Sequence, residues 1–143
     1  MNEADLYIVL DDLRRDESFR SHPYLDTEGN LTIGYGRNLD ANGISKDEAE
    51  TMLRNNVMET IDELKTHITI WKELDGARKR ALINMGFQMG WPRLRKFVKM
   101  LAAIEAEYFE LASKEVLNSR YAKQVPGRAS RVAALIRFGE EHD

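Results

Sequence analysis

Residues 16–36 read DESFRSHPYLDTEGNLTIGYG. They carry three reactive side chains, and the sequence pattern changes twice, from helical periodicity to turn-forming residues and then to strand-like alternation. Glu17 follows an apolar stripe, Asp26 falls in a run of turn-forming residues, and Thr32 lies on an alternating segment. The stretch therefore predicts a helix, a turn and a short strand in succession. The rest of the chain is interpreted outward from these three elements.

The segment before Glu17 is predicted to be an amphipathic helix. Leu6, Leu10 and Leu13 are spaced by four and three residues, which places them on one helical face. Counting on by four reaches Glu17, so its carboxyl group is expected to end a stripe that faces the core. Burial and the negative end of the helix dipole both raise the pKa of a carboxyl group, which suits a general acid. The alternative is a solvated Glu17 paired with Arg20.

After Glu17 the sequence predicts a turn. His22–Pro23 disfavours a helix, because the residue before proline avoids helical dihedral angles. Residues 26–30, DTEGN, then combine Asp, Asn and Gly, which favour turn conformations. Asp26 is a candidate catalytic carboxylate here, although a simple turn cap would explain it equally well.

The turn is followed by a predicted strand. Residues 31–36, LTIGYG, alternate between larger apolar residues and small ones, which is a period of two. Leu31, Ile33 and Tyr35 are expected to face a core. Thr32 is expected on the opposite face beside two glycines, where the missing side chains leave room for a ligand. An ordinary structural threonine is the alternative interpretation.

Composition indicates one compact domain, possibly of two lobes. The chain has 143 residues, of which 43% are hydrophobic and 31% charged. There is no cysteine, and His22, His67 and His142 lack the spacing of metal ligands, so we expect neither a metal nor another cofactor. No apolar run approaches the roughly 20 residues of a membrane-spanning helix. The acidic N-terminus lacks the apolar core of a signal peptide, so we expect accumulation in the cytoplasm.

Charge is unevenly distributed along the chain. Residues 1–71 hold 7 basic and 15 acidic residues, whereas residues 72–143 hold 14 basic and 9 acidic ones. The basic half could attract an anionic polymer, either nucleic acid or bacterial cell wall. Two solvated faces of opposite sign would explain the same distribution.

The remainder of the chain predicts helices. Residues 37–44 are interpreted as a loop, and Ser45 with Glu48 forms a capping box for a helix that extends to about His67. Asp75 is a predicted N-cap of a second helix, whose buried stripe includes the methionines as core filling.

Trp91–Pro92 should break the second helix. Segments 93–104 and 106–118 show further helical periodicity, with Val98 and Leu117 among the residues expected to face inward. Pro126 suits the first turn of a last helix.

The spacing of Glu17, Asp26, Thr32 and a following Gly-x-Gly resembles the active-site signature of the phage-type lysozymes, glycoside hydrolase family twenty-four. The likeness extends to residues 45–50 (SKDEAE), 81–90 (ALINMGFQMG) and 119–132 (SRYAKQVPGRASRV). It therefore covers nearly the whole chain.

The resemblance implies an α+β, mostly helical, two-lobed fold. An N-terminal β-hairpin lobe would occupy about residues 1–45 and carry the active site. A linking helix would occupy about 46–67, and a helical C-terminal lobe about 68–143.

The resemblance also implies a muramidase, or endolysin, that hydrolyses the β-1,4 bond between N-acetylmuramic acid and N-acetylglucosamine in peptidoglycan. Glu17 would be the general acid, and Asp26 and Thr32 would hold the attacking water in an inverting reaction. If Glu17 and Asp26 lie only about 5 Å apart, a retaining route is favoured instead. The family's substrate-binding positions correspond to Phe87, Gln88, Gln124 and Arg128.

Other expectations follow from the same resemblance. The partner would be peptidoglycan rather than nucleic acid or membrane, and the enzyme would act as a monomer that reaches the periplasm through a holin-type pore. A lytic transglycosylase and a non-catalytic wall-binding protein are the alternatives. Both fit less well, because Asp26 and Thr32 accompany Glu17.

Three residues depart from the family pattern. Ser18 stands in place of the usual Gly after the catalytic Glu, Tyr121 in place of a Trp, and Arg37 in place of a His. Any ion pair made by Arg37 is expected to keep its positive charge at neutral pH.

Overall fold

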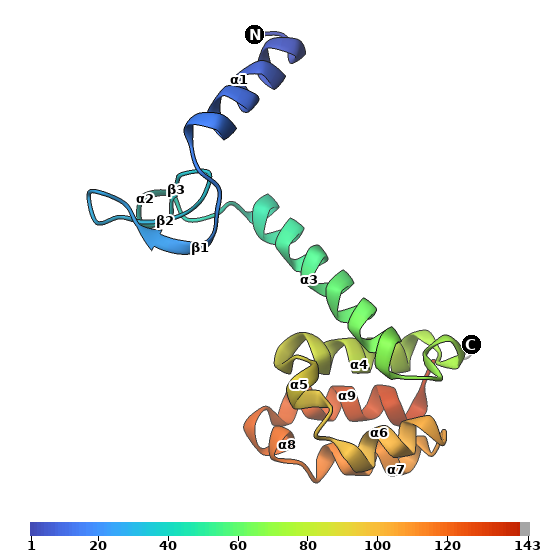
Figure 1. Cartoon of the computed structure of the whole chain (residues 1–143). Coiled ribbons are helices and arrows are strands. Elements are labelled where there is room, and N and C mark those ends of the chain that lie inside the picture. The colour runs from blue at the N-terminus through green and yellow to red at the C-terminus, as the bar shows by residue number, and fades with distance from the viewer. Residues whose placement is uncertain (141–143) are drawn as a thin grey trace. The chain divides into compact units, whose positions relative to one another are not determined.

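The structure is a computed structural model and describes residues 1–140. Figure 1 shows a mostly helical chain with one small sheet near the N-terminus, which confirms the predicted α+β, lysozyme-like fold class. Residues 141–143, the last of the expected C-terminal lobe and including His142, lie outside the described residues. The elements, in chain order, are α1 (Glu3–Asp16), β1 (Arg20–Leu25), β2 (Leu31–Gly34), β3 (Arg37–Asn38), α2 (Leu39–Asn42), α3 (Lys46–His67), a 3₁₀ turn (Trp71–Glu73), α4 (Gly76–Met89), α5 (Trp91–Leu94), α6 (Val98–Glu105), α7 (Phe109–Leu117), α8 (Arg120–Gln124) and α9 (Pro126–Phe138).

The chain divides into two compact units, residues 1–51 and 52–143. The first contains α1, the sheet, α2 and the first residues of α3, and the second contains the remaining helices. Among residues 1–140, no helix combines the length and the apolar character that crossing a bilayer requires.

The sheet of the first unit is antiparallel, with β2 between β1 and β3. Thr32, on β2, pairs with Tyr24 on one side and Asn38 on the other, and only 3% of its surface is exposed. Leu31 is 37% exposed and Tyr35 51% exposed. The predicted strand face is therefore wrong. Alternation separates the two faces correctly, but which face is covered depends on the cross-strand neighbours of Thr32.

Helix α1 begins after Asn2, whose side chain accepts a hydrogen bond from the amide of Asp5, and ends at Asp16. None of its residues is buried, and Leu6 and Leu13 are each about half exposed. The expected core-facing stripe is therefore wrong within the described structure. Periodicity identifies residues that share a helical face, but whether another element covers that face depends on the tertiary structure.

Residues 37–44 are only partly the predicted loop, because residues 37–42 form β3 and the short helix α2. Asn38 ends the strand and caps α2, its side-chain oxygen accepting a 3.0 Å hydrogen bond from the Ala41 amide. A single Asn can end a strand and cap a helix in this way, so a cluster of turn-forming residues does not by itself indicate a loop.

The predicted capping box at the start of α3 is confirmed. The Ser45 hydroxyl accepts from the Glu48 amide at 3.1 Å, and the Glu48 carboxylate accepts from the Ser45 amide at 2.9 Å. The helix ends at His67, as predicted. Only its C-terminal half contributes to a core, through Leu64.

The second unit has a continuous apolar core. Helix α9 packs against α4, α7 and α8, and α6 packs against α7. Asp75 caps α4 as predicted, and Met85 is fully buried, which confirms the interpretation of that methionine as core filling. The large, fully buried side chains are Leu64, Leu82, Met85, Leu94, Met100, Ile104, Val116, Val132 and Ile136.

Two predicted helical segments in this unit need correction. Residues 93–104 form α5 and α6 rather than one helix, with the break before Val98, which is 68% exposed. In the next segment, Leu117 is 51% exposed rather than inward-facing. Both residues lie at a helix end, where the regular period no longer determines which direction a side chain faces. Pro126 begins α9, as predicted.

Candidate active site

The side chain of Glu17 lies against the turn that follows β2. Gly36 in that turn has φ +83°, and a Cβ atom added there would lie 3.2 Å from Oε2 of Glu17. A side chain at residue 36 would therefore strain the backbone and push against the adjacent carboxylate. This contact brings the end of α1 to the hairpin.

Two sequence-based interpretations of Glu17 are not found in the structure. Glu17 is exposed, so its expected burial at the end of an apolar stripe is wrong, for the same reason as for Leu6 and Leu13. The alternative pairing with Arg20 is also absent among the described residues. Instead, the guanidinium of Arg20 lies over the ring of Tyr24, 4.5 Å from its centroid.

Asp26 closes the turn between β1 and β2. Its Oδ1 accepts hydrogen bonds from the amides of Asn30 at 2.8 Å and Glu28 at 2.9 Å. The bond from the Asn30 amide, followed by the bond from Glu28, holds the pKa of Asp26 below its ordinary value. Asp26 is therefore a turn cap, and it is also a carboxylate that stays ionised at neutral pH.

Asn30 joins Asp26 to Thr32. Its carbonyl oxygen accepts from the Asp26 amide and from the Thr32 hydroxyl, both at 2.9 Å. Its side-chain nitrogen also reaches Oδ2 of Asp26 at 3.4 Å. The sequence identifies Asn30 only as a turn former, because the role of its backbone carbonyl group leaves no signal in the sequence.

Arg37 and Glu48 hold the other end of the sheet to the start of α3. The guanidinium donates to both carboxylate oxygens, at 2.8 and 2.7 Å, and also to the carbonyl of Gly43 at 3.1 Å. The bonds from Arg37, and then those from Ser45, lower the pKa of Glu48 to about 2. Glu48 therefore serves both the helix cap and the ion pair.

A cavity of 560 Å³ lies near this ion pair, lined by residues from Ile33 to Asn38 together with Asn42, Ile44 and Glu48. Glu17, Asp26 and Thr32 do not line it. Among residues 1–140, no three His, Cys, Asp or Glu side chains gather as metal ligands would.

The predicted substrate-binding residues are divided among different places in the second unit. Gln88 and Gln124 line one cavity of 250 Å³, whereas Phe87 lines another of 340 Å³. Arg128 is tied to α4, its Nε donating to Oδ1 of Asn84 at 2.6 Å.

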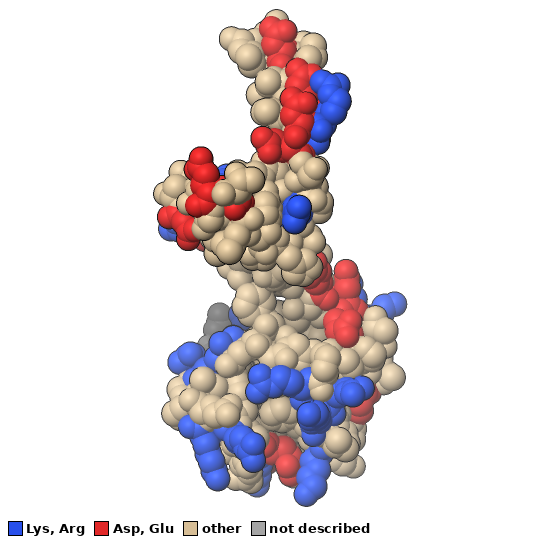
Figure 2. All heavy atoms as spheres, turned by 60° about the vertical axis from the view of Figure 1, so that its left-hand side comes forward, with Lys and Arg blue, Asp and Glu red and all other residues tan. Residues whose placement is uncertain are grey.

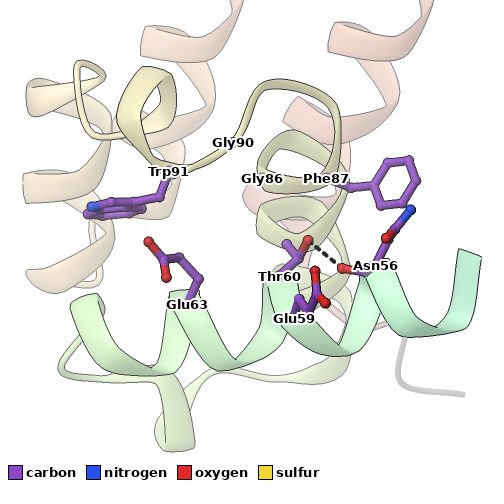
Figure 3. Close-up of a pocket in the computed structure, with 8 residues that line it drawn as sticks. All are labelled: Asn56, Glu59, Thr60, Glu63, Gly86, Phe87, Gly90 and Trp91. Carbon is purple, nitrogen blue, oxygen red and sulfur yellow. Dashed lines mark hydrogen bonds between the residues drawn. The ribbon is translucent and has the colours of Figure 1, made fainter. Parts of the chain in front are cut away.

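The cavity that contains Phe87 lies between α3 and the end of α4. Figure 3 shows Phe87 beside Asn56 at one end and Trp91 beside Glu63 at the other. Trp91 stacks on His67 with the ring centroids 4.3 Å apart. The sequence identifies Trp91 only as part of a helix break, because its place in a cavity depends on the packing of α3 against α4.

Residues 14–137 match the sequence model of the phage lysozyme family. The chain belongs to the phage lysozyme family. Similar proteins include probable T4-type lysozymes 2 and 1 of Dictyostelium discoideum, which are 34% and 32% identical to it. These matches cover 90% and 92% of the chain, and 93% and 94% of the relatives.

A pre-baseplate central spike protein, Gp5, of Enterobacteria phage T4 is also 34% identical over 89% of the chain. The match covers only 27% of that larger protein, so only a part of the spike protein is similar to this lysozyme. Membership of the phage lysozyme family makes the chain a glycoside hydrolase of the lysozyme type.

The Arg37–Glu48 pair predicts how the stability of this lysozyme depends on pH. Because the pKa of Glu48 falls from 4.5 to about 2 on folding, the unfolded chain binds more protons between these values. The lowered pKa of Asp26 acts in the same direction. The free energy of unfolding should therefore lose these contributions as pH falls from about 4.5 towards 2, and retain them in full above that window.

Urea unfolding at a series of pH values tests this prediction. Glu48→Gln should reduce the acid-dependent part of the loss, whereas Glu50→Gln, at an exposed position on the same helix, should leave it unchanged. The same pH dependence in wild type and Glu48→Gln would contradict the assigned role of the ion pair.

Proposed function

We propose that this lysozyme hydrolyses the β-1,4 bond between N-acetylmuramic acid and N-acetylglucosamine in peptidoglycan, with Glu17 as the general acid. The observation that carries the proposal is the position of the Glu17 carboxyl group against Gly36. Gly36 follows the strand that holds Thr32, so an acid and a polar hairpin belong to one structural unit.

The hydrogen bonds of the hairpin support a water-positioning role for Asp26 and Thr32. The Thr32 hydroxyl uses its proton in the bond to Asn30, so its oxygen is left as an acceptor for a water molecule that reaches this nearly buried side chain, of which 3% is exposed. Asp26 is ionised and can accept another. Two acceptors that engage both protons of one water molecule leave its lone pairs free to attack.

The proposed reaction is a single displacement. The Glu17 carboxylic acid donates its proton to the glycosidic oxygen as the bond from that oxygen to the anomeric carbon breaks. The water oxygen bonds to that carbon from the opposite face, and Asp26 takes the released proton. This inverting route requires carboxyl groups roughly 6.5–9.5 Å apart, which leaves room for the water.

The same proposal includes the biological setting. The enzyme would act as a monomer on the cell wall and pass the inner membrane through a holin-type pore. The lysozyme names of the Dictyostelium relatives support the activity, but they leave the route to the wall unaddressed.

Glu17→Gln tests the acid. This substitution keeps the shape of the side chain and removes the proton it donates, so lysis of permeabilised bacteria should fall at least about a hundredfold. The circular dichroism spectrum should not change, because Glu17 is exposed. Mass spectrometry of the wild-type digest should find reducing-end muramic acid. Anhydro-muramic acid in its place would identify a lytic transglycosylase.

Gly36→Ala tests the position of the acid, with Gly43→Ala as a control. Both glycines have a positive φ, +83° and +55°, so the new methyl group strains the backbone in each variant. Only at residue 36 does the methyl group meet Glu17, since nothing lies within 4 Å of a Cβ at residue 43. Both variants should lose stability, but only Gly36→Ala should lose most of its activity per folded molecule.

The comparison is made by measuring melting temperature and lysis rate for both variants. Equal lysis rates after correction for the folded fraction would mean that the contact between Glu17 and Gly36 does not position the catalytic acid.

A further inference from the structure

Two exposed aromatic rings flank the contact between Glu17 and Gly36. Phe19 lies two residues after Glu17, and Tyr35 directly precedes Gly36. The ring centroids are 5.4 Å apart, and the ring planes are tilted by 45°. Tilted rings at this distance attract one another, because their edges and faces carry opposite partial charges. The pair therefore joins the chain that leaves α1 to the chain that leaves β2.

The strand register explains why these two rings meet. Arg20, the first residue of β1, pairs with Gly34, the last residue of β2. In an antiparallel sheet, one further step outward along each strand places Phe19 opposite Tyr35. Side chains of directly opposite residues are close enough to interact. The ring pair thus continues the ladder by one position beyond its last backbone pair.

This register depends on an irregularity in β1. Tyr24 pairs with Thr32, whereas Arg20, four residues earlier, pairs with Gly34, which is only two residues further along β2. The first strand therefore has extra residues between these two pairs. Pro23 lies among them, and proline suits such a bulge because it has no N–H group to donate to a ladder.

The irregularity changes which residues meet near the candidate acid. A ladder continued at the register of the Thr32 pair would place Phe19 opposite Arg37, and the two rings would not meet. The shifted register places Phe19 opposite Tyr35 instead. The chain just before Phe19 then passes Gly36, where the acid is found.

Little else fixes the direction of the Glu17 side chain, which makes no hydrogen bond or ion pair within residues 1–140. Its backbone amide donates to the Leu13 carbonyl at 2.7 Å, but that bond fixes only the end of α1. Arg20, the next cation along the chain, lies over Tyr24. Figure 2 shows charged side chains along α1 but a mostly tan, uncharged surface over the neighbouring sheet. The sheet therefore offers this segment an apolar contact rather than an ion pair.

We propose that Phe19 and Tyr35 are positioning residues for the catalytic acid. Their ring contact holds the segment after Glu17 against the hairpin, and so keeps the carboxyl group beside Gly36. The proposal rests on the proposed function of Glu17. Because the rings act on the acid and not on the bound sugar, breaking their contact should lower kcat and leave KM unchanged.

Kinetics of leucine variants test the proposal. Phe19→Leu and Tyr35→Leu each remove one ring but keep an apolar side chain. A small misplacement of a catalytic group slows the reaction strongly, so each variant should lose roughly tenfold to a hundredfold in kcat. The double variant should lose no more than either single variant, because both substitutions break the same contact.

Two controls separate the ring contact from other effects of substitution. Tyr35→Phe keeps the ring and should retain the wild-type kcat. Tyr108→Leu removes a ring that is 65% exposed and belongs to no ring pair among the described residues, so it should also leave kcat unchanged. Melting temperatures of all variants confirm that the rates are compared between folded proteins.

NMR follows the position of the acid directly, without substrate. In the wild-type protein, NOE cross-peaks should connect the γ protons of Glu17 with the α protons of Gly36, because these groups are in contact. The cross-peaks should disappear in Phe19→Leu and persist in Tyr35→Phe. This comparison does not depend on the reaction that the enzyme catalyses.

Three results would overturn the proposal. The first is an unchanged kcat in the leucine variants with the cross-peaks retained. The second is a rise in KM at unchanged kcat, which would mean that the rings bind the sugar. The third is an equal loss in Tyr35→Phe and Tyr35→Leu, which would assign the effect to the hydroxyl group. Failure of the proposed function gives a different result: Glu17→Gln would retain its activity, while the cross-peaks would still show whether the ring pair holds Glu17 in place.

Discussion

Glu17 lies against the turn after β2 at a residue that has no side chain. The backbone at Gly36 has a positive φ that other residues rarely adopt, and the space a Cβ would occupy is already in contact with the Glu17 carboxylate. This contact joins the end of α1 to the turn after β2. The proposed chemistry depends on it, because an exposed side chain at a helix end has little else to fix its direction.

The first unit is held mainly by polar contacts. Thr32 is the one buried side chain among residues 1–51, so this unit has no apolar core comparable to that of the second. Asn30 joins the turn to the central strand, and Glu48 joins β3 to α3 while also capping that helix. Hydrogen bonds of this kind are directional, so they can fix reactive groups with little buried surface.

Apolar packing dominates the second unit. Side chains from α3, α4, α5, α6, α7 and α9 form one core, and the charged residues stay on its surface. The first unit, by contrast, supplies the candidate acid and the candidate water-binding residues of the proposed function.

Sequence patterns predicted those features that depend on neighbouring residues. The Ser45–Glu48 capping box, the Asp75 cap and the start of α9 at Pro126 all rest on contacts within a few residues. The same patterns were wrong where burial depends on distant elements. The exposed stripe of α1 and the buried face of Thr32 are two examples, because periodicity cannot specify which face another element covers.

The candidate site shows the same difference between features that depend on neighbouring residues and features that depend on distant elements. Spacing identified Glu17, Asp26 and Thr32 as candidates, since a motif records the order of reactive residues along the chain. It gave no role to Asn30, whose carbonyl group carries no sequence signal and joins two of the candidates only in three dimensions. Nor could spacing reveal that Gly36 makes room for Glu17.

The central claim is that Asp26 and Thr32 hold a water molecule that attacks the sugar opposite Glu17. The most direct test is ¹H NMR of the reducing ends released in the first minutes of digestion, before the anomers equilibrate. Our account predicts that the α-anomer accumulates first, because a single displacement on a β-linked sugar inverts the anomeric carbon. Initial release of the β-anomer would contradict it and would make Asp26 a nucleophile in a retaining reaction.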